Sequence, residues 1–166
     1  MDVLEEFDFY VRYSAIKLLS TLSYNRNTDL QQCVLTSPMG ITRLSDLLND
    51  KRDIIRNGMI IYLSIQHRLL KDISMESQIQ IYLYKTFYFS CVYVCWGFLL
   101  ESLLLLISLT RDNAEIQKLV TFQATFEKLL TVIEDEEGIS GGIIVQDSLS
   151  LMHNLLRYNV SNQVSL

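Results

Sequence analysis

The sequence predicts an all-α protein made of stacked helical repeats, a fragment of an armadillo- or HEAT-like solenoid that an irregular apolar insertion interrupts. The first observation is a segment that returns. Residues 11–22 carry an arginine followed by a run of leucines, and they recur as residues 55–57 continued by residues 102–109. The β-branched residue, the arginine and the leucines stay in register between the two copies.

The residues that follow each copy match as well. Residues 29–34 correspond to residues 115–120, and residues 41–44 correspond to residues 126–129. A third, fainter copy opens at Val145. Self-similarity of helical segments at a spacing of roughly 40 to 47 residues is typical of armadillo and HEAT repeats.

The first helix is predicted to begin after Asp8, whose side chain can accept hydrogen bonds from the free amides of the opening turn. Val11, Ala15, Leu18 and Leu22 follow at intervals of four, three and four residues. This spacing places them on one helical face, which we expect to point inward.

Two shorter helices are predicted to complete the first repeat. Thr28 followed by Gln31 is typical of a capping box. Ser37-Pro38 predicts a further start, with serine as the cap and proline in the first helical position. The apolar positions of these two helices predict inward-facing side chains at Leu30, Cys33, Val34, Ile41, Leu44 and Leu48.

The second repeat is interrupted. Residues 1–58 hold one repeat and the start of the next, residues 59–100 form the insertion, and residues 101–166 hold the remainder of the second repeat and the start of a third. Within the insertion, residues 79–84 alternate like a strand and residues 87–94 are rich in β-forming types.

After the insertion the helical period resumes. Asp112 with Glu115 predicts an acidic helix start. The run Glu134-Asp135-Glu136-Glu137 predicts a solvated helix end or, alternatively, a contact for a basic partner. The apolar spacing predicts inward positions at Ile116, Leu119, Val120, Phe126, Leu129, Leu130, Ile133, Val145, Leu149, Met152 and Leu156.

The composition limits the classes of function that the chain can have. The 166 residues are 49% hydrophobic with a net charge of −5, which favours a folded chain and argues against a nucleic-acid partner. Three cysteines form no disulfide framework, and the acidic N-terminus is unlike a signal peptide. These features predict a cytoplasmic protein.

No residue pattern predicts catalysis, a cofactor or a metal. Cys91 and Cys95 lack the further ligands of a zinc site. His67 and His153 stand apart from any nucleophile motif, and residues 138–142 lack the lysine that ends a phosphate-binding loop. We therefore predict a protein that is not an enzyme.

A small integral membrane protein is the alternative. Residues 86–109 are long enough to form an apolar membrane span, broken only by Glu101. A carboxylate at the centre of a span costs about 2.5–3.5 kcal/mol. The repeat pattern also assigns the leucines after Glu101 to the solenoid.

Several motifs, in order along the chain, resemble the globular head of the general vesicular transport factor family, the Uso-type Golgi tethers. They lie at residues 4–12, 36–44, 53–57, 115–120, 141–147, 154–156 and 161–163. The resemblance implies an armadillo-like head of a peripheral membrane tether that acts before membrane fusion in ER-to-Golgi and intra-Golgi transport. It also implies Rab GTPases, golgins and SNAREs as partners, homodimers, and a cytoplasmic location on Golgi and vesicle membranes.

The chain departs from the family pattern in two ways. In the family, the counterpart of Arg56-Asn57 is followed directly by the counterpart of Glu101, so residues 58–100 have no equivalent. Our hypothesis is that they are a translated intron, because residues 87–100 are rich in codons typical of a splice acceptor tract. Transcripts that lack this segment would support the hypothesis, and their absence would refute it. The family's long coiled coil and acidic tail are also missing.

The number of repeats bears on stability. A solenoid buries its core only by stacking neighbouring repeats, and about three repeats are needed for a stable fold. With two repeats, one of them split, and a partial third, the isolated chain is predicted to be marginally stable or prone to aggregate.

Overall fold

The computed structural model describes residues 4, 9–49, 97–136, 138–157 and 159–164. The chain divides into two compact units, one made of residues 1–50 with 98–166 and the other of residues 51–97. Nearly all described residues lie in the first unit. The strand-like segments 79–84 and 87–94, with Cys91 and Cys95, lie outside the described residues.

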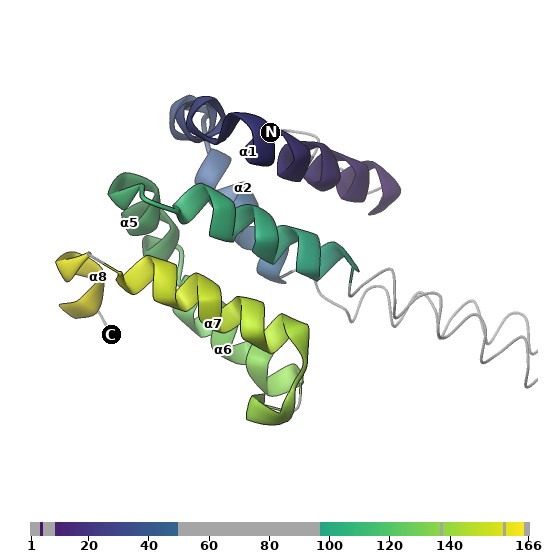
Figure 1. Ribbon diagram of the computed structural model, residues 1–166, viewed down its shortest axis with the longest axis vertical. Helices are drawn as coiled ribbons and strands as arrows, with labels where there is room; N and C mark the ends of the chain where they lie inside the picture. The colour runs from purple at the N-terminus through teal and green to yellow at the C-terminus, as the bar shows by residue number, and fades with distance from the viewer. Residues whose placement is uncertain (1–3, 5–8, 50–96, 137, 158, 165–166) are drawn as a thin grey trace, which may run out of the picture. The chain divides into compact units, whose positions relative to one another are not determined.

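The described part of the first unit is helical. Its core lies between stacked helices that come from both sides of residues 51–97 in the sequence (Figure 1). The helices are α1 (Phe9–Thr36), α2 (Gly40–Asp46), residues 97–110, α5 (Ala114–Phe122), α6 (Thr125–Asp135), α7 (Ile143–Leu156) and α8 (Val160–Val164), with short 3-10 turns η2 (Leu47–Asn49) and η3 (Gly138–Ser140). We call residues 97–110 the leucine helix.

Helix α1 is two helices joined at a kink. Arg26 has non-helical backbone angles, φ −142° and ψ 54°. The sequence predicted two separate helices in this region, and the kink marks the boundary between them. The sequence predicted a capping-box role for the side chain of Gln31. Its Nε2 atom instead donates to the carbonyl oxygens of Leu109 (2.9 Å) and Arg111 (3.1 Å).

The helices fall into three repeats. The first half of α1, the leucine helix and α7 are the opening helices of successive repeats. The second helices of the three repeats are the second half of α1, then α5, then α8. The third helices of the first two repeats are α2 and α6. Helix α2 packs against α1 and α5, and α6 packs against α5 and α7. The predicted armadillo-like arrangement is therefore present.

The turn before each third helix is the same. Met39 precedes α2 with φ 57°, and Ala124 precedes α6 with φ 54°, so both occupy the left-handed region that few side chains adopt. Each carbonyl then accepts the first helical hydrogen bond, from Arg43 or Lys128. A repeated, unfavourable backbone conformation is structural evidence that these segments are copies of one unit.

Two predicted helix starts are corrected. The sequence predicted Ser37 as the cap of the third helix and Pro38 as its first residue. Helix α2 instead begins at Gly40, and Ser37 and Pro38 lie in the preceding turn. A side chain on Gly40 would approach the carbonyl oxygen of Val34 to 2.7 Å, which explains the glycine. Helix α5 is capped by Asn113, whose side-chain oxygen accepts from the amide of Ile116 at 3.0 Å, whereas Asp112 precedes the cap.

Burial of the opening helices depends on their place in the stack. In the leucine helix, Leu103, Leu105, Leu106 and Leu109 are at most 1% exposed. In contrast, the predicted inward residues Val11, Leu18 and Leu22 of α1 and Leu149 of α7 are exposed. The leucine helix is buried on both sides because a repeat lies on each side of it, whereas α1 and α7 each have only one neighbouring repeat within the described residues.

The other inward predictions have mixed outcomes within single helices. Those confirmed as buried are Val34, Ile41, Leu44, Leu48, Ile116, Val120, Phe126, Leu129 and Val145. Leu30, Met152 and Leu156 are partly buried against the core. Those found exposed are Cys33, Leu119 and Leu130.

The third copy is shifted by one residue from the predicted alignment. Asn113 caps α5, and Asn159 caps α8 by accepting from the amide of Asn162 at 3.4 Å. Aligning these two asparagines makes Leu105 equivalent to Leu151 and Leu109 equivalent to Leu155. All four leucines are buried, which supports this alignment.

Side-chain amides join the repeats at the carboxyl end of the leucine helix. Asn27 donates to the carbonyl of Ser108 (2.9 Å), and Asn154 donates to the carbonyl of Ile107 (3.0 Å). Gln117 donates to the carbonyl of Thr110 (2.9 Å). Carbonyls at a helix end have no partner within the helix, so all three repeats help to satisfy those of the leucine helix.

The insertion and the membrane span remain partly outside the described residues. Phe98 and Leu99, which the sequence assigns to the end of the insertion, are buried in the core of the first unit. Among the described residues, no helix is both long and apolar enough to cross a membrane. Of the candidate span 86–109, residues 97–109 are helical and contribute leucines to the solenoid core.

Candidate protein-binding grooves

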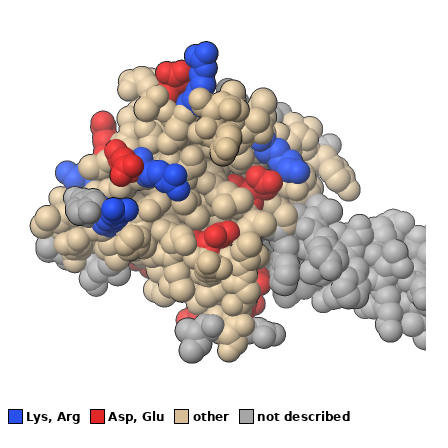
Figure 2. All heavy atoms as spheres, in the orientation of Figure 1, with Lys and Arg blue, Asp and Glu red and all other residues tan. Residues whose placement is uncertain are grey.

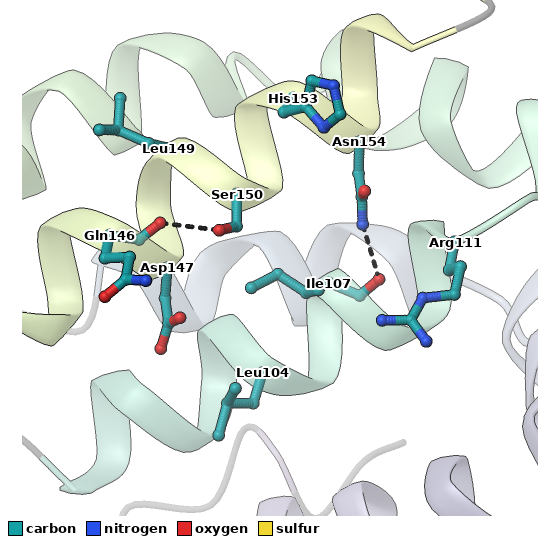
Figure 3. Close-up of a pocket in the computed structure, with 9 residues that line it drawn as sticks. All are labelled: Leu104, Ile107, Arg111, Gln146, Asp147, Leu149, Ser150, His153 and Asn154. Atoms are coloured by element: carbon teal, nitrogen blue, oxygen red, sulfur yellow. Dashed lines mark hydrogen bonds between the residues drawn. The ribbon is translucent and has the colours of Figure 1, made fainter.

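A groove runs between the leucine helix and α7, with a volume of about 590 Å³. Leu104, Ile107 and Arg111 line it from the leucine helix (Figure 3). The lining residues from α7 are Gln146, Asp147, Leu149, Ser150, His153 and Asn154. The groove therefore combines three apolar side chains with six polar or charged ones.

Asp147 is the most unusual group in this groove. Its side chain extends from α7 toward the leucine helix (Figure 3). Its Oδ2 atom is buried and has no hydrogen-bond partner among the described residues. Burial raises the pKa of the Asp147 carboxyl above its usual value of 3.8, because desolvation disfavours the charged form. A cationic or hydrogen-bond-donating group in the groove would stabilise the carboxylate.

An equivalent groove lies on the other side of the leucine helix. It has a volume of about 540 Å³ and is lined by Lys17, Ser20, Thr21 and Tyr24 of α1 and by Glu101 of the leucine helix. Glu101 occupies the same repeat position as Asp147. Each groove therefore carries one carboxylate at the same place, one repeat apart.

A third recess follows the carboxyl end of the leucine helix. It has a volume of about 460 Å³ and is lined by residues 111–114 with Gln117, Asn154 and Arg157. Asn154 borders both this recess and the Asp147 groove. Figure 2 shows one face of the molecule, where uncharged side chains cover most of the surface and acidic and basic side chains lie beside one another in small groups.

The structure places the residues that the sequence singled out as follows. His153 lines the Asp147 groove together with Ser150, whose hydroxyl donates to the carbonyl of Gln146 at 2.9 Å. His67 lies outside the described residues. Within the described ranges, no cluster of three His, Cys, Asp or Glu side chains is placed to hold a metal ion. Glu134 and Asp135 are exposed at the end of α6, whereas Glu136 is buried.

The sequence did not single out the grooves as a site. Glu101 was noted as a break in an apolar run and as the residue where the family pattern resumes, and Asp147 only as part of a family motif. Their equivalence depends on the register of the third copy, which the sequence alignment misplaced by one residue. The signal that could have found them is the recurrence of an acidic residue at one repeat position.

The described geometry defines a class, the helical-repeat proteins of the armadillo type. Such proteins offer extended surfaces assembled from successive repeats. No family model matches the chain.

Comparison with known proteins identifies the family. The chain is 37% identical to human general vesicular transport factor p115 over 163 residues, which cover 98% of this chain and 12% of the human protein. It is 38% identical to golgin candidate 6 of Arabidopsis thaliana over 90% of this chain and 12% of the relative. A crystal structure of Uso1 matches with a TM-score of 0.69 and 26% identity, over 98% of this chain and 18% of that one.

The chain is therefore homologous to one segment of the p115/Uso1 vesicular transport factors. This finding confirms the resemblance that the motifs indicated, together with the armadillo-like fold. The chain spans 12% of the human and plant relatives. The activity and partners of those longer proteins accordingly come to this chain only as proposals.

Proposed function

We propose that this chain is a non-catalytic protein-binding scaffold, a part of a vesicle-tethering head that acts in ER-to-Golgi and intra-Golgi docking before membrane fusion. The observation that carries the proposal is the 37% identity to a vesicular transport factor over 98% of the chain. The stacked repeats support it, because the grooves between them offer recesses to a partner.

The proposed partners are a Rab GTPase, golgins and SNAREs, with peripheral association at cytoplasmic Golgi and vesicle membranes. The grooves on either side of the leucine helix are the proposed contact surface. Each presents one carboxylate. Apolar side chains lie in the Asp147 groove, whereas the Glu101 groove is lined by Lys17, Ser20, Thr21 and Tyr24. A basic side chain of a partner would pair with either carboxylate, and apolar side chains beside it would fit Leu104, Ile107 and Leu149 in the Asp147 groove.

Co-purification tests the proposal. The tagged 166-residue chain is incubated with a full-length tether of the family and with its Rab GTPase loaded with GTP. We expect retention of the Rab, the tether or both. Failure to retain either protein would contradict the proposed function.

Charge reversal locates the contact. Glu101→Lys and Asp147→Lys should reduce retention, because each places a cation where a basic partner side chain would lie. Asp29→Lys is the matched control, since its side chain is 67% exposed and lines none of the three recesses described above. Equal retention by all three variants would exclude the grooves as the contact surface.

Carbonate extraction of membranes distinguishes the proposal from the membrane-span alternative. A peripheral scaffold is released by carbonate, whereas a chain that spans the bilayer through residues 86–109 stays in the membrane pellet. We expect release.

A further inference from the structure

Both ends of the helical stack present exposed apolar side chains. On α1, Leu18 is 61% exposed and Leu22 is 42% exposed. On α7, Leu149 is 52% exposed, and Met152 and Leu156 beside it are only partly buried. We call these surfaces the α1 face and the α7 face.

The interior of the same molecule shows what covers such faces. Leu105 and Leu109 of the leucine helix occupy the repeat positions of Leu18 and Leu22, and both are 1% exposed. Leu103 occupies the position of Leu149 and is fully buried. The neighbouring repeats of this chain cover these leucines, so a repeat of the same kind fits each open face.

The residues around the exposed leucines favour a contact between protein surfaces. One or two turns from Leu18, the side chains on its side of the helix are Ser14, Thr21, Leu22 and Asn25. On α7 the corresponding neighbours of Leu149 are Gln146, Met152, His153 and Leu156. Neither set contains an acidic residue, a lysine or an arginine, whose burial would carry a desolvation cost. The nearest charges to Leu149 are Asp147 and Arg111, which line the same groove.

We propose that a second copy of this chain stacks its α1 face on the α7 face of the first, continuing the repeat interface already present within each molecule. The contact joins two different surfaces, so it is heterologous. Each added copy presents a new open α7 face. Association of this kind does not stop at dimers, because a head-to-tail contact closes only when its rotation forms a ring. The inference does not depend on the proposed transport role.

Light scattering coupled to size-exclusion chromatography tests the stacking with the full 166-residue chain. We expect the average mass to rise with concentration from 19.3 kDa past that of a dimer. Leu18→Glu removes the α1 face and Leu149→Glu removes the α7 face, and each variant alone should remain a monomer. Far-UV circular dichroism confirms that each variant keeps its helices.

Mixing the two variants provides the decisive result. The Leu18→Glu chain retains an intact α7 face, and the Leu149→Glu chain retains an intact α1 face. The mixture should therefore form a one-to-one heterodimer that grows no further. Leu22→Lys replaces Leu18→Glu in the mixture if that variant loses its helices.

The control variant is Leu130→Glu. Leu130 lies on α6 and, like Leu149, is 52% exposed. This variant should associate as the parent chain does.

Several results would overturn the stacking. They are a parent chain that is monomeric at all concentrations, a single-face variant that still associates, and a mixture that contains only monomers. A two-fold symmetric dimer is one such result, because it would survive at least one of the single-face substitutions. Equal loss of association in Leu130→Glu would also overturn it.

Discussion

The leucine helix and α7 have the same role in successive repeats, yet they differ in what they bury. Leu103 is fully buried, whereas the equivalent Leu149 is 52% exposed. The difference does not come from the residue type, since both are leucines. It comes from position, because a repeat lies on each side of the leucine helix. In a solenoid, the neighbour decides whether an apolar residue belongs to the core.

The largest expected effect comes from shortening these two leucines. Leu103→Ala should lower the free energy of unfolding by about 2–5 kcal/mol, because it removes buried contacts and leaves a cavity. Leu149→Ala should cost about 1 kcal/mol, since half of its side chain already meets water. Urea denaturation followed by circular dichroism measures both losses.

The predicted marginal stability of the chain sharpens this test. If the parent unfolds cooperatively, Leu103→Ala should abolish the transition or move it to much lower urea, while Leu149→Ala leaves it in place. Equal losses for the two variants would show that the position in the stack does not decide burial. A highly stable parent chain would contradict the expectation drawn from its repeat number.

The comparison also explains how far the sequence could predict the fold. Periodicity and self-similarity were sufficient for the helices and the repeats, because both depend on spacing within one segment. The inward face of an end helix could not be predicted in this way. Leu18 and Leu105 belong to the same pattern, and only the presence of a neighbouring repeat separates an exposed leucine from a buried one.

Local backbone features limited the prediction in a different way. Met39 and Ala124 adopt left-handed angles without being glycine or asparagine, so no residue type marks the turn. Asn113 rather than Asp112 caps α5, a choice between adjacent residues that are both good caps. The candidate grooves depend on the register of three copies, and the faintest copy was misplaced by one residue.

The side-chain amides provide a second comparison between buried and exposed copies. Gln117 donates to the carbonyl of Thr110 (2.9 Å), and Gln163 donates to the carbonyl of Leu156 (2.8 Å), each seven residues back. Gln117 is 6% exposed, whereas Gln163 is exposed. Gln117→Ala should cost about 1–3 kcal/mol, because it leaves a buried carbonyl without a donor.

Gln163→Ala is the matched control. Water can replace its hydrogen bond, so we expect a loss of about 0.5 kcal/mol or less. Thermal unfolding of both variants beside the parent measures the difference. A similar melting temperature for the two variants would mean that burial adds nothing to this bond.

Asp147 allows a test through pH. Because burial raises its pKa in the folded chain above 3.8, the folded state holds this proton more tightly than the unfolded state does. The contribution of Asp147 to stability therefore falls as pH rises from about 3.8 through the raised pKa. Asp147→Asn should unfold at a higher temperature than the parent at neutral pH.

The same comparison at acid pH is the internal control. Below pH 3.8 the carboxyl is protonated in both states, so the advantage of Asp147→Asn should be smallest there. Thermal melts of the two proteins across this range give the profile. An advantage that is constant with pH would assign the effect to packing.

The smallest expected effect is the difference in stabilisation between two ion pairs that differ in solvent exposure. Lys128 of α6 is 3.1 Å from Asp46 of α2, with side-chain exposures of 13% and 59%. It also donates to Ser45 at 3.2 Å and so joins the third helices of two repeats. The Arg26–Asp29 pair lies within α1 at 3.4 Å, with exposures of 75% and 67%.

We expect Asp46→Asn to lower the free energy of unfolding by about 0.5–1 kcal/mol at low salt, and Asp29→Asn by about 0.3 kcal/mol or less. The Asp46 pair gains more because Lys128 is already largely desolvated and held by Ser45, so pairing costs less side-chain freedom. Added salt should reduce the loss from Asp46→Asn, since its carboxylate remains open to solvent. Urea denaturation at low and high ionic strength measures both. Equal losses of unfolding free energy would show that the ion pair between two repeats stabilises the fold no more than the ion pair within α1.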